Sequence, residues 1–293
     1  MAFTGKRRFV GLGFGAIQSG LFVYEADRTG AYAPPLVVDV RADLVAGLRA
    51  GGGRFRLNIA RSDRVDVVEL GPVEVADSSV ADEREAVVAA IAGADEFASA
   101  LPSVAFYQTD SPSSPHRLLA DGLHLRTASA PLIVYCAENH RSAATLLEAA
   151  VLEACQPAER EGVRARARYV DTVIGKMSGV ITDPAEVEAR RLATITGALP
   201  EAFLVEAFDR ILVSRVDPAG VQHPGIPVLR EVDDLAPFED AKLLGHNATH
   251  ALAGFIGHLL GLSLVAELRG TPGAMAFLRD AFIGESGAAL IAR

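Results

Sequence analysis

Short apolar segments alternate with amphipathic helical segments along the first half of the chain, and this alternation limits the fold more than any other feature. Buried-strand patterns cover 7–12, 34–40 and 130–139, and helical patterns lie between them. Strands that are separated by helices of this length are typical of a parallel α/β sheet. The sequence therefore predicts such a sheet with helices on its faces.

Other segments extend this pattern. Residues 54–60 and 65–70 alternate in polarity like the strands of a side sheet. An acidic start and a run of alanines predict one helix over 81–101, and 103–109 has a strand-like composition. Further strands are expected after residue 168.

The pattern changes near the C-terminus. The stretch 217–227 is rich in proline and glycine, which indicates a linker, and from about residue 232 onward the periodicity is helical. We therefore expect two domains: a nucleotide-binding α/β domain over 1–225, with extra strands, and a smaller all-helical domain over 226–293.

The balance of charges excludes some partners. The net charge is −9, so the chain gains little from a phosphate backbone, and nucleic acid is not an expected partner. Cys136 and Cys155 lie in no metal-binding or disulfide pattern, which fits a reduced cytoplasm. The apolar run 251–266 is shorter than the roughly 20 residues that span a bilayer, so no membrane segment is expected.

A glycine-rich turn follows the first strand in the sequence "GFGAIQSG". Gly13 allows a tight turn, and Gly15 allows the backbone to approach a pyrophosphate at the start of the next helix. Gln18 replaces the third glycine of the usual GxGxxG pattern, and a purely structural turn is the alternative. The predicted cofactor-binding residues here are Gly13, Phe14, Gly15, Ala16, Ile17 and Gln18. The turn makes the predicted fold Rossmann-like.

Asp39 ends the second predicted strand. A carboxylate at this place binds a ribose 2′-hydroxyl and repels a 2′-phosphate, so Asp39 favours NAD over NADP. Arg41 is close enough in sequence to weaken that preference.

A helical segment near the C-terminus carries a polar face. With a helical period of about 100° per residue, Glu239, Lys242, Asn247 and His250 share one broad face. A substrate with several hydroxyl groups would give these groups partners. The alternative is a solvated helix start, with Lys242 in water and His250 bonded in the core.

Asn139 ends the apolar strand "PLIVYC". The carboxyl ends of parallel strands are where ligands bind in such sheets, so Asn139 is a further candidate. An asparagine that only begins a turn is the alternative.

These segments together resemble the polyol-specific long-chain dehydrogenases, the mannitol dehydrogenase family. Lys242, Asn247 and His250, followed by "ALAGFIGHLLG", resemble its signature helix, and "GFGAIQSG" and "CAEN" are similar to its cofactor turn and its second active-site segment. "ESGAALIAR" is similar to a segment of the mannitol-1-phosphate branch. The chain departs from the family by lacking the cofactor-turn arginine, where Ser19 stands, and by ending at Arg293, where members continue with further helices.

The resemblance implies a metal-independent, NAD-dependent interconversion of a polyol or its phosphate with a ketose, most like mannitol 1-phosphate with fructose 6-phosphate. It implies that Lys242 is the general base, that Asn139 and Asn247 stabilise the developing alkoxide, and that His250 orients a substrate hydroxyl. Glu239 would relay the proton. The expected protein is cytoplasmic, and an oligomer is compatible with the sequence.

Three other functions stay open. One is a dehydrogenase that acts on an unphosphorylated polyol or a sugar acid. Another is a protein that binds or senses NAD without turnover. The pairing of lysine with asparagine is also similar to the β-hydroxyacid dehydrogenases, although those enzymes space the two residues four apart and this chain spaces Lys242 and Asn247 five apart.

Overall fold

The computed structural model describes residues 5–217 and 222–292 of the chain. These residues form two compact units, Met1–Asp233 and Asp234–Arg293. Part of the stretch expected as a linker, 218–221, lies outside the described residues. The two units are considered separately below.

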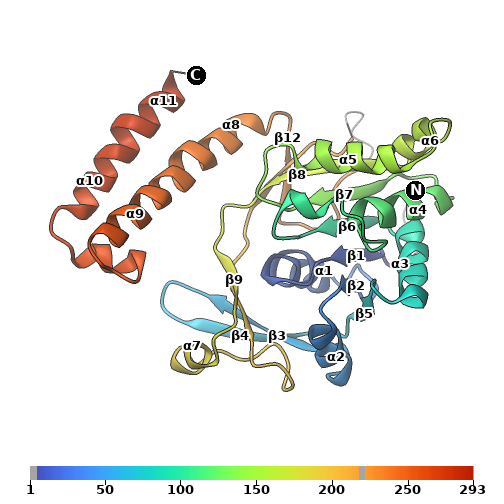
Figure 1. Ribbon diagram of the computed structural model, residues 1–293, viewed down its shortest axis with the longest axis horizontal. Coiled ribbons are helices and arrows are strands. Elements are labelled where there is room, and N and C mark those ends of the chain that lie inside the picture. The colour runs from blue at the N-terminus through green and yellow to red at the C-terminus, as the bar shows by residue number, and fades with distance from the viewer. Residues whose placement is uncertain (1–4, 218–221, 293) are drawn as a thin grey trace. The chain divides into compact units, whose positions relative to one another are not determined.

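The main sheet of the first unit has eight strands in the order β12-β11-β8-β7-β6-β1-β2-β5 (Figure 1). Neighbouring strands are parallel except for β11 and β8, which are antiparallel. The expected parallel α/β sheet is therefore confirmed. The strands are β1 (Phe9–Leu12), β2 (Leu36–Asp39), β5 (Glu74–Asp77), β6 (Glu96–Ser99), β7 (Leu132–Cys136), β8 (Ala167–Val173), β11 (Ile211–Ser214) and β12 (Leu229–Val232).

Two apolar cores lie on the two faces of this sheet, because successive side chains of a strand point in opposite directions. In β1, Phe9 belongs to one core, and Val10 and Leu12 belong to the other. The second core is covered by α3 (Ala81–Gly93), α4 (Pro115–Leu125), α5 (Ala143–Ala154) and α6 (Arg160–Ala165). The first is covered by η1 (Gln18–Val23), a π-helix that continues into α1 (Tyr24–Thr29), and by α2 (Ala42–Ala50).

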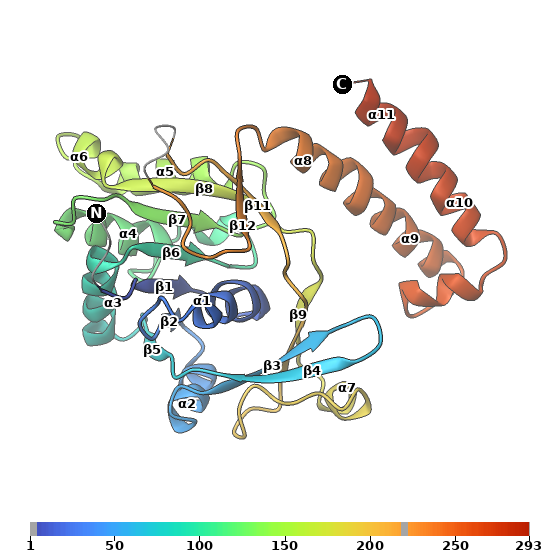
Figure 2. The ribbon, with the colours of Figure 1, turned by 180° about the vertical axis from the view of Figure 1, so that it is seen from behind.

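A second sheet packs into the first of these cores (Figure 2). Its order is β4-β3-β10-β9, with β3 (Phe55–Ala60) and β4 (Val65–Leu70) forming a hairpin, β10 (Ala202–Glu206) parallel to β3, and β9 (Ser178–Ile181) antiparallel to β10. The short α7 (Pro184–Ala189) connects β9 toward β10. This sheet joins two segments that are far apart in the sequence, 55–70 and 178–206.

Two expected elements between 81 and 109 are wrong. The helix does not reach residue 101: α3 ends at Gly93, and Glu96–Ser99 form β6, a strand buried along its whole length in the middle of the sheet. The expected strand over 103–109 is a turn, because the Ser103 hydroxyl accepts from the backbone N–H of Ala105 and starts the 3₁₀-helix η2 (Val104–Phe106). Residues 96–99 form a strand because they pair with β1 and β7. Residues 103–106 form a turn because the Ser103 hydroxyl binds the backbone locally.

A fully buried carboxylate ties the start of β6 to its surroundings. Glu96 accepts hydrogen bonds from the Tyr32 hydroxyl at 2.7 Å, the Tyr135 hydroxyl at 2.8 Å and the backbone N–H of Gly225 at 3.1 Å, and it pairs with Arg7. Burial and the adjacent carboxylate raise the pKa of both tyrosines. The neutral phenols therefore act as donors to a charge that has no access to water.

The second unit is helical in its described part, whereas Leu229–Val232, placed by the sequence in the all-helical domain, form β12 in the sheet of the first unit. The small core of the second unit consists of Ala253, Leu268, Ala274 and Leu278. Within residues 5–217 and 222–292, no helix is long and apolar enough to cross a bilayer. The elements are α8 (Ala236–Asp240), η3 (Ala241–Asn247), α9 (Ala248–Leu259), η4 (Val265–Gly270), α10 (Ala274–Ala281), η5 (Phe282–Gly287) and α11 (Ala288–Ile291).

Candidate functional site

The glycine turn follows β1 directly, at the carboxyl edge of the main sheet. Gly13 adopts a φ of 81°, and its backbone N–H donates to Val38 at 2.8 Å. A Cβ at Gly13 would lie 2.8 Å from a methyl carbon of Leu101, so both conformation and space require glycine there. A Cβ at Gly15 would meet nothing within 4 Å, so Gly15 faces open space.

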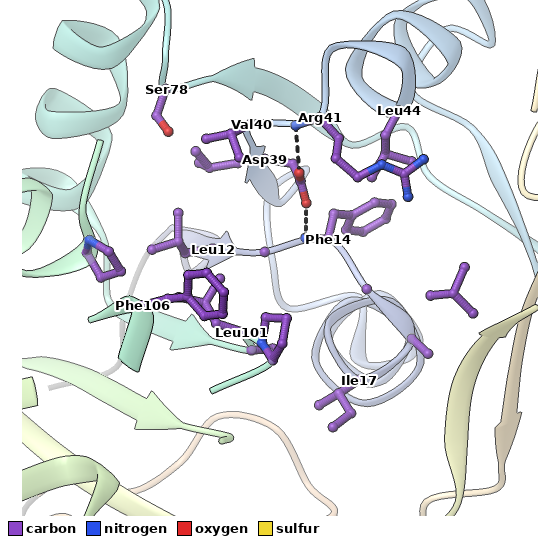
Figure 3. Close-up of a pocket in the computed structure, with 18 of the residues that line it drawn as sticks. Leu12, Phe14, Ile17, Asp39, Val40, Arg41, Leu44, Ser78, Leu101 and Phe106 are labelled. Carbon is purple, nitrogen blue, oxygen red and sulfur yellow. Dashed lines mark hydrogen bonds between the residues drawn. The ribbon is translucent and has the colours of Figure 1, made fainter. Parts of the chain in front are cut away.

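Asp39 holds this turn from the neighbouring strand. Its Oδ2 accepts from the backbone N–H of Phe14 at 2.7 Å, and its Oδ1 accepts from the backbone N–H of Arg41 at 2.9 Å, as the dashed lines in Figure 3 show. The side chain is half-buried. Each carboxylate oxygen has a second lone pair, so the group can still accept from ribose hydroxyls.

A cavity of about 600 Å³ opens beside the turn. This volume is in the range of cofactor sites. Its lining includes the turn, the end of β2, the segments after β5 and β6, and the second sheet. The residues from these parts include Gly13, Phe14, Gly15, Ala16, Ile17, Asp39, Val40, Arg41, Ser78, Leu101, Phe106, Ser178, Val180 and Phe203.

Five of the six residues expected in the glycine turn thus line the cavity, and Gln18 has a different place. Gln18 is fully buried, and its side chain lies over Gly11 of β1. Among the described residues, neither polar atom of its amide has a hydrogen-bond partner. Gln18 is therefore packed between the helix and the strand.

The ring of Phe14 connects the turn to the second sheet. It meets Phe55 edge to face at 5.1 Å between ring centres and Phe203 at 5.6 Å. Phe14 is only 1% exposed as a whole residue, so its side chain anchors the turn to the second sheet. Edge-to-face packing of this kind adds about 0.5–1.5 kcal/mol to the burial of each pair.

Glu138, a buried carboxylate that the sequence did not indicate, supports the wall of the cavity that contains Leu101. Glu138 accepts from the Ser99 hydroxyl at 2.6 Å, from the backbone N–H of Leu101 at 2.9 Å and from the Tyr107 hydroxyl. Burial raises the pKa of Glu138. Its place inside the apolar stretch "YCAE" was the available signal, since a carboxylate there needs several donors.

Asn139 follows Glu138 directly and is exposed. Like the cavity, it lies in the first unit, just beyond the carboxyl end of β7. Asp171, in β8, accepts from the backbone N–H of Ala144 at 2.8 Å. It thereby provides a partner for one of the N–H groups in the first turn of α5 that have none within the helix. These groups mark the same edge of the sheet as the glycine turn.

The other candidate residues lie on one continuous helix of the second unit. Glu239 is in α8, Lys242 and Asn247 are in η3, and His250 is in α9. Lys242 is half-buried, and burial lowers the pKa of its ammonium group. The π-helical hydrogen bonds of η3 change the angular spacing that an α-helix would give these side chains.

His246 is a neighbour that the sequence did not single out. Its ring lies 4.2 Å from that of His250, measured between centres. Both histidines are exposed, whereas Glu239 and Asn247 are half-buried. The polar group on this helix therefore includes five side chains.

Comparison with known proteins gives sequence relatives for part of the chain. No family model matches it. It is 30% identical over 178 residues to mannitol-1-phosphate 5-dehydrogenase of Bacillus velezensis, an alignment that covers 59% of this chain and 42% of that enzyme. The enzyme of the same name from Aspergillus niger is 25% identical over 150 residues, with 51% and 35% covered. The chain thus matches less than half the length of these relatives.

Solved structures give the same fold. A substrate-free D-sorbitol dehydrogenase superposes with a TM-score of 0.78 at 14% identity, covering 94% of this chain and 64% of that one. Pseudomonas fluorescens mannitol 2-dehydrogenase, solved with NAD and D-mannitol, gives a TM-score of 0.72 at 16% identity, with 95% and 63% covered. The chain is thus similar in sequence to mannitol-1-phosphate 5-dehydrogenases over part of their length, and it shares its fold with these two polyol dehydrogenases.

Proposed function

We propose that the chain is a cytoplasmic, NAD-dependent oxidoreductase that interconverts mannitol 1-phosphate and fructose 6-phosphate without a metal. The observation that carries this proposal is the cavity beside the glycine turn, with Gly15 open to it and Asp39 at its edge, in a chain homologous to mannitol-1-phosphate 5-dehydrogenases. One of the solved neighbours was crystallised with NAD.

The residues present fit a dinucleotide. Gly15 leaves room for a pyrophosphate at the start of the helix that begins at Ala16, where free N–H groups and the helix dipole favour anions. In this proposal Asp39, whose carboxylate holds the turn through the Phe14 N–H, also accepts from a ribose 2′-hydroxyl. When bound, the nicotinamide supplies the acceptor for hydride.

Lys242 is the proposed general base. A lysine must lose its proton to accept one from an alcohol, and its ordinary pKa of about 10.4 keeps it charged at neutral pH. Burial lowers the pKa of Lys242, which is the direction that the role requires. Its half-buried position on η3 supports this assignment.

The remaining polar groups have supporting roles in the proposal. Asn247 and Asn139 donate amide N–H groups to the substrate oxygen as it gains negative charge. His250 binds a neighbouring substrate hydroxyl, and Glu239 passes the proton onward to solvent. Each role can be tested by a single substitution that keeps the size of the side chain.

The test is the formation of NADH, followed by its absorbance, with a panel of polyols and polyol phosphates. Turnover of mannitol 1-phosphate is expected, and Lys242→Ala should reduce kcat by at least about 100-fold while leaving NAD affinity unchanged. Lys6→Ala is the matched control, because Lys6 is exposed. If only unphosphorylated polyols or sugar acids are turned over, the proposed substrate is wrong and the dehydrogenase assignment stands. NAD binding without any turnover would favour a sensing role.

A further inference from the structure

The guanidinium of Arg41 is held by two carboxylates at the edge of the cavity. Its Nη1 and Nη2 each donate to a different oxygen of Glu201 at 3.0 Å. Its Nη2 and Nε donate to Asp43 at 2.8 Å and 3.3 Å. All three nitrogens of the guanidinium are therefore engaged.

Arg41 lies where a 2′-phosphate would be recognised. Its backbone N–H binds the carboxylate of Asp39, the residue placed for the ribose, and its side chain lines the same cavity (Figure 3). An arginine near this carboxylate is the usual group that accepts the 2′-phosphate of NADP. The sequence alone left open whether Arg41 has this effect.

Glu201 is the stronger of the two partners. Both carboxylates make bidentate pairs with Arg41, but the side chain of Glu201 is 15% exposed, whereas the side chain of Asp43 is 63% exposed. Bidentate pairs of arginine with carboxylate are strong, and ion pairs in water are weakened by solvent. Glu201 directly precedes β10, so the second sheet brings it to Arg41, which lines the cavity.

We propose that Glu201 is a specificity-determining residue, which disfavours NADP by holding the Arg41 guanidinium away from the ribose 2′-phosphate. One positive charge here faces three negative charges, those of Asp39, Asp43 and Glu201. A 2′-phosphate would add about two more negative charges and would have to compete for a guanidinium that is already paired. The proposal rests on the proposed function only through its dinucleotide cofactor.

The experiment measures the Kd of NAD⁺ and of NADP⁺ for the full chain by calorimetry, which does not require turnover. Glu201→Gln keeps the size of the side chain and removes its charge. It should lower the Kd of NADP⁺ about tenfold and change that of NAD⁺ less than about twofold. Asp43→Asn should have a smaller effect, because Asp43 is exposed.

Two further variants make the result specific. Arg41→Ala in the Glu201→Gln background should abolish the gain for NADP⁺, since the freed guanidinium is its proposed source. Glu186→Gln is the matched control: it removes the same charge from an exposed pair with Arg190 on α7 and should alter neither Kd.

Four outcomes would overturn the proposal. In folded Glu201→Gln, an unchanged Kd for NADP⁺ alongside normal NAD⁺ binding would reject Glu201 alone and leave the cofactor assignment standing. A gain that persists without Arg41, or a larger gain in Asp43→Asn, would also reject it. If the unsubstituted protein and Glu201→Gln both bind neither dinucleotide, the proposed cofactor fails as well.

Discussion

The side chain of Gln18 covers Gly11 across the first strand and helix, so that a Cβ on Gly11 would lie 2.6 Å from the Gln18 Cδ. In the usual dinucleotide turn, the third glycine lets the helix pack closely on the strand. Here the helix carries glutamine at that position, and the small residue is on the strand. We infer that the close packing of helix and strand is kept because Gly11 leaves room on the strand for the larger Gln18 on the helix.

We expect Gly11→Ala to lower the free energy of unfolding by about 1–3 kcal/mol, since the added methyl group overlaps a buried side chain. Gln18→Ala should recover most of this loss in the double variant, which a double-mutant cycle by urea denaturation would measure. Gly15→Ala is the control: its Cβ meets nothing within 4 Å, so it should keep stability and weaken dinucleotide binding. Additive losses from Gly11 and Gln18 would contradict this inference.

Lys242 should titrate below the ordinary lysine pKa. The chain has three lysines, and Lys6 is exposed and Lys176 pairs with Asp209 at 3.4 Å. Reductive methylation with ¹³C-formaldehyde would give each lysine a resolvable NMR signal, and Lys242→Arg would identify the shifted one. Because burial lowers the pKa of Lys242, its signal should change at a pH below the ordinary lysine value of 10.5. If the three lysine signals titrate over the same pH range, the support for Lys242 as a general base is lost.

The same burial predicts how stability depends on pH. The pKa of Lys242 is lower in the folded chain than the ordinary 10.5, so the unfolded chain binds more protons between the two values, and stability rises with pH across that window. Lys242→Met removes the buried charge and should stabilise the protein at pH 7. The gain should shrink as pH approaches 10.5. Urea midpoints at both pH values test this, with Lys6→Met expected to show no such change.

Glu138→Gln should weaken dinucleotide binding. The carboxylate receives three donors, and a glutamine amide would turn its own N–H₂ toward one of them, at a cost of about 1–3 kcal/mol. Leu101 lies in the wall of the cavity, so its displacement should raise the Kd of NAD⁺ severalfold. Calorimetry measures this, and Glu161→Gln, in an exposed position on α6, is the control. Equal affinities in the two variants would show that Glu138 does not hold the wall.

The glycine turn and Asp39 could be predicted because their signal is local. Gly13, Gly15 and Asp39 lie within one strand–helix–strand unit, whose geometry follows from the chain itself. The pairing of Arg41 with Glu201 could not be predicted, because it requires β10 to lie beside β3 in a second sheet. Sequence spacing holds no information on such contacts.

Two features of secondary structure were also beyond the sequence. Between the helix α3 and β6, Gly93 is the one residue that signals a break in the sequence. The residues of β6, Glu96–Ser99, favour a strand no more than they favour a helix. Its pairing with β1 and β7 makes it a strand. In η3, π-helical hydrogen bonds replace the α-helical period on which the expected polar face depended.

Phe203 of β10 lines the same cavity as Gly13, and this has a consequence for biosynthesis. During translation, Gly13 and Asp39 leave the ribosome long before β10 does, so the growing chain holds a glycine turn whose facing wall has not yet been made. A nucleotide can be enclosed only after the polypeptide has extended past β10. Ligand capture would then stabilise finished molecules and leave their shorter precursors unprotected.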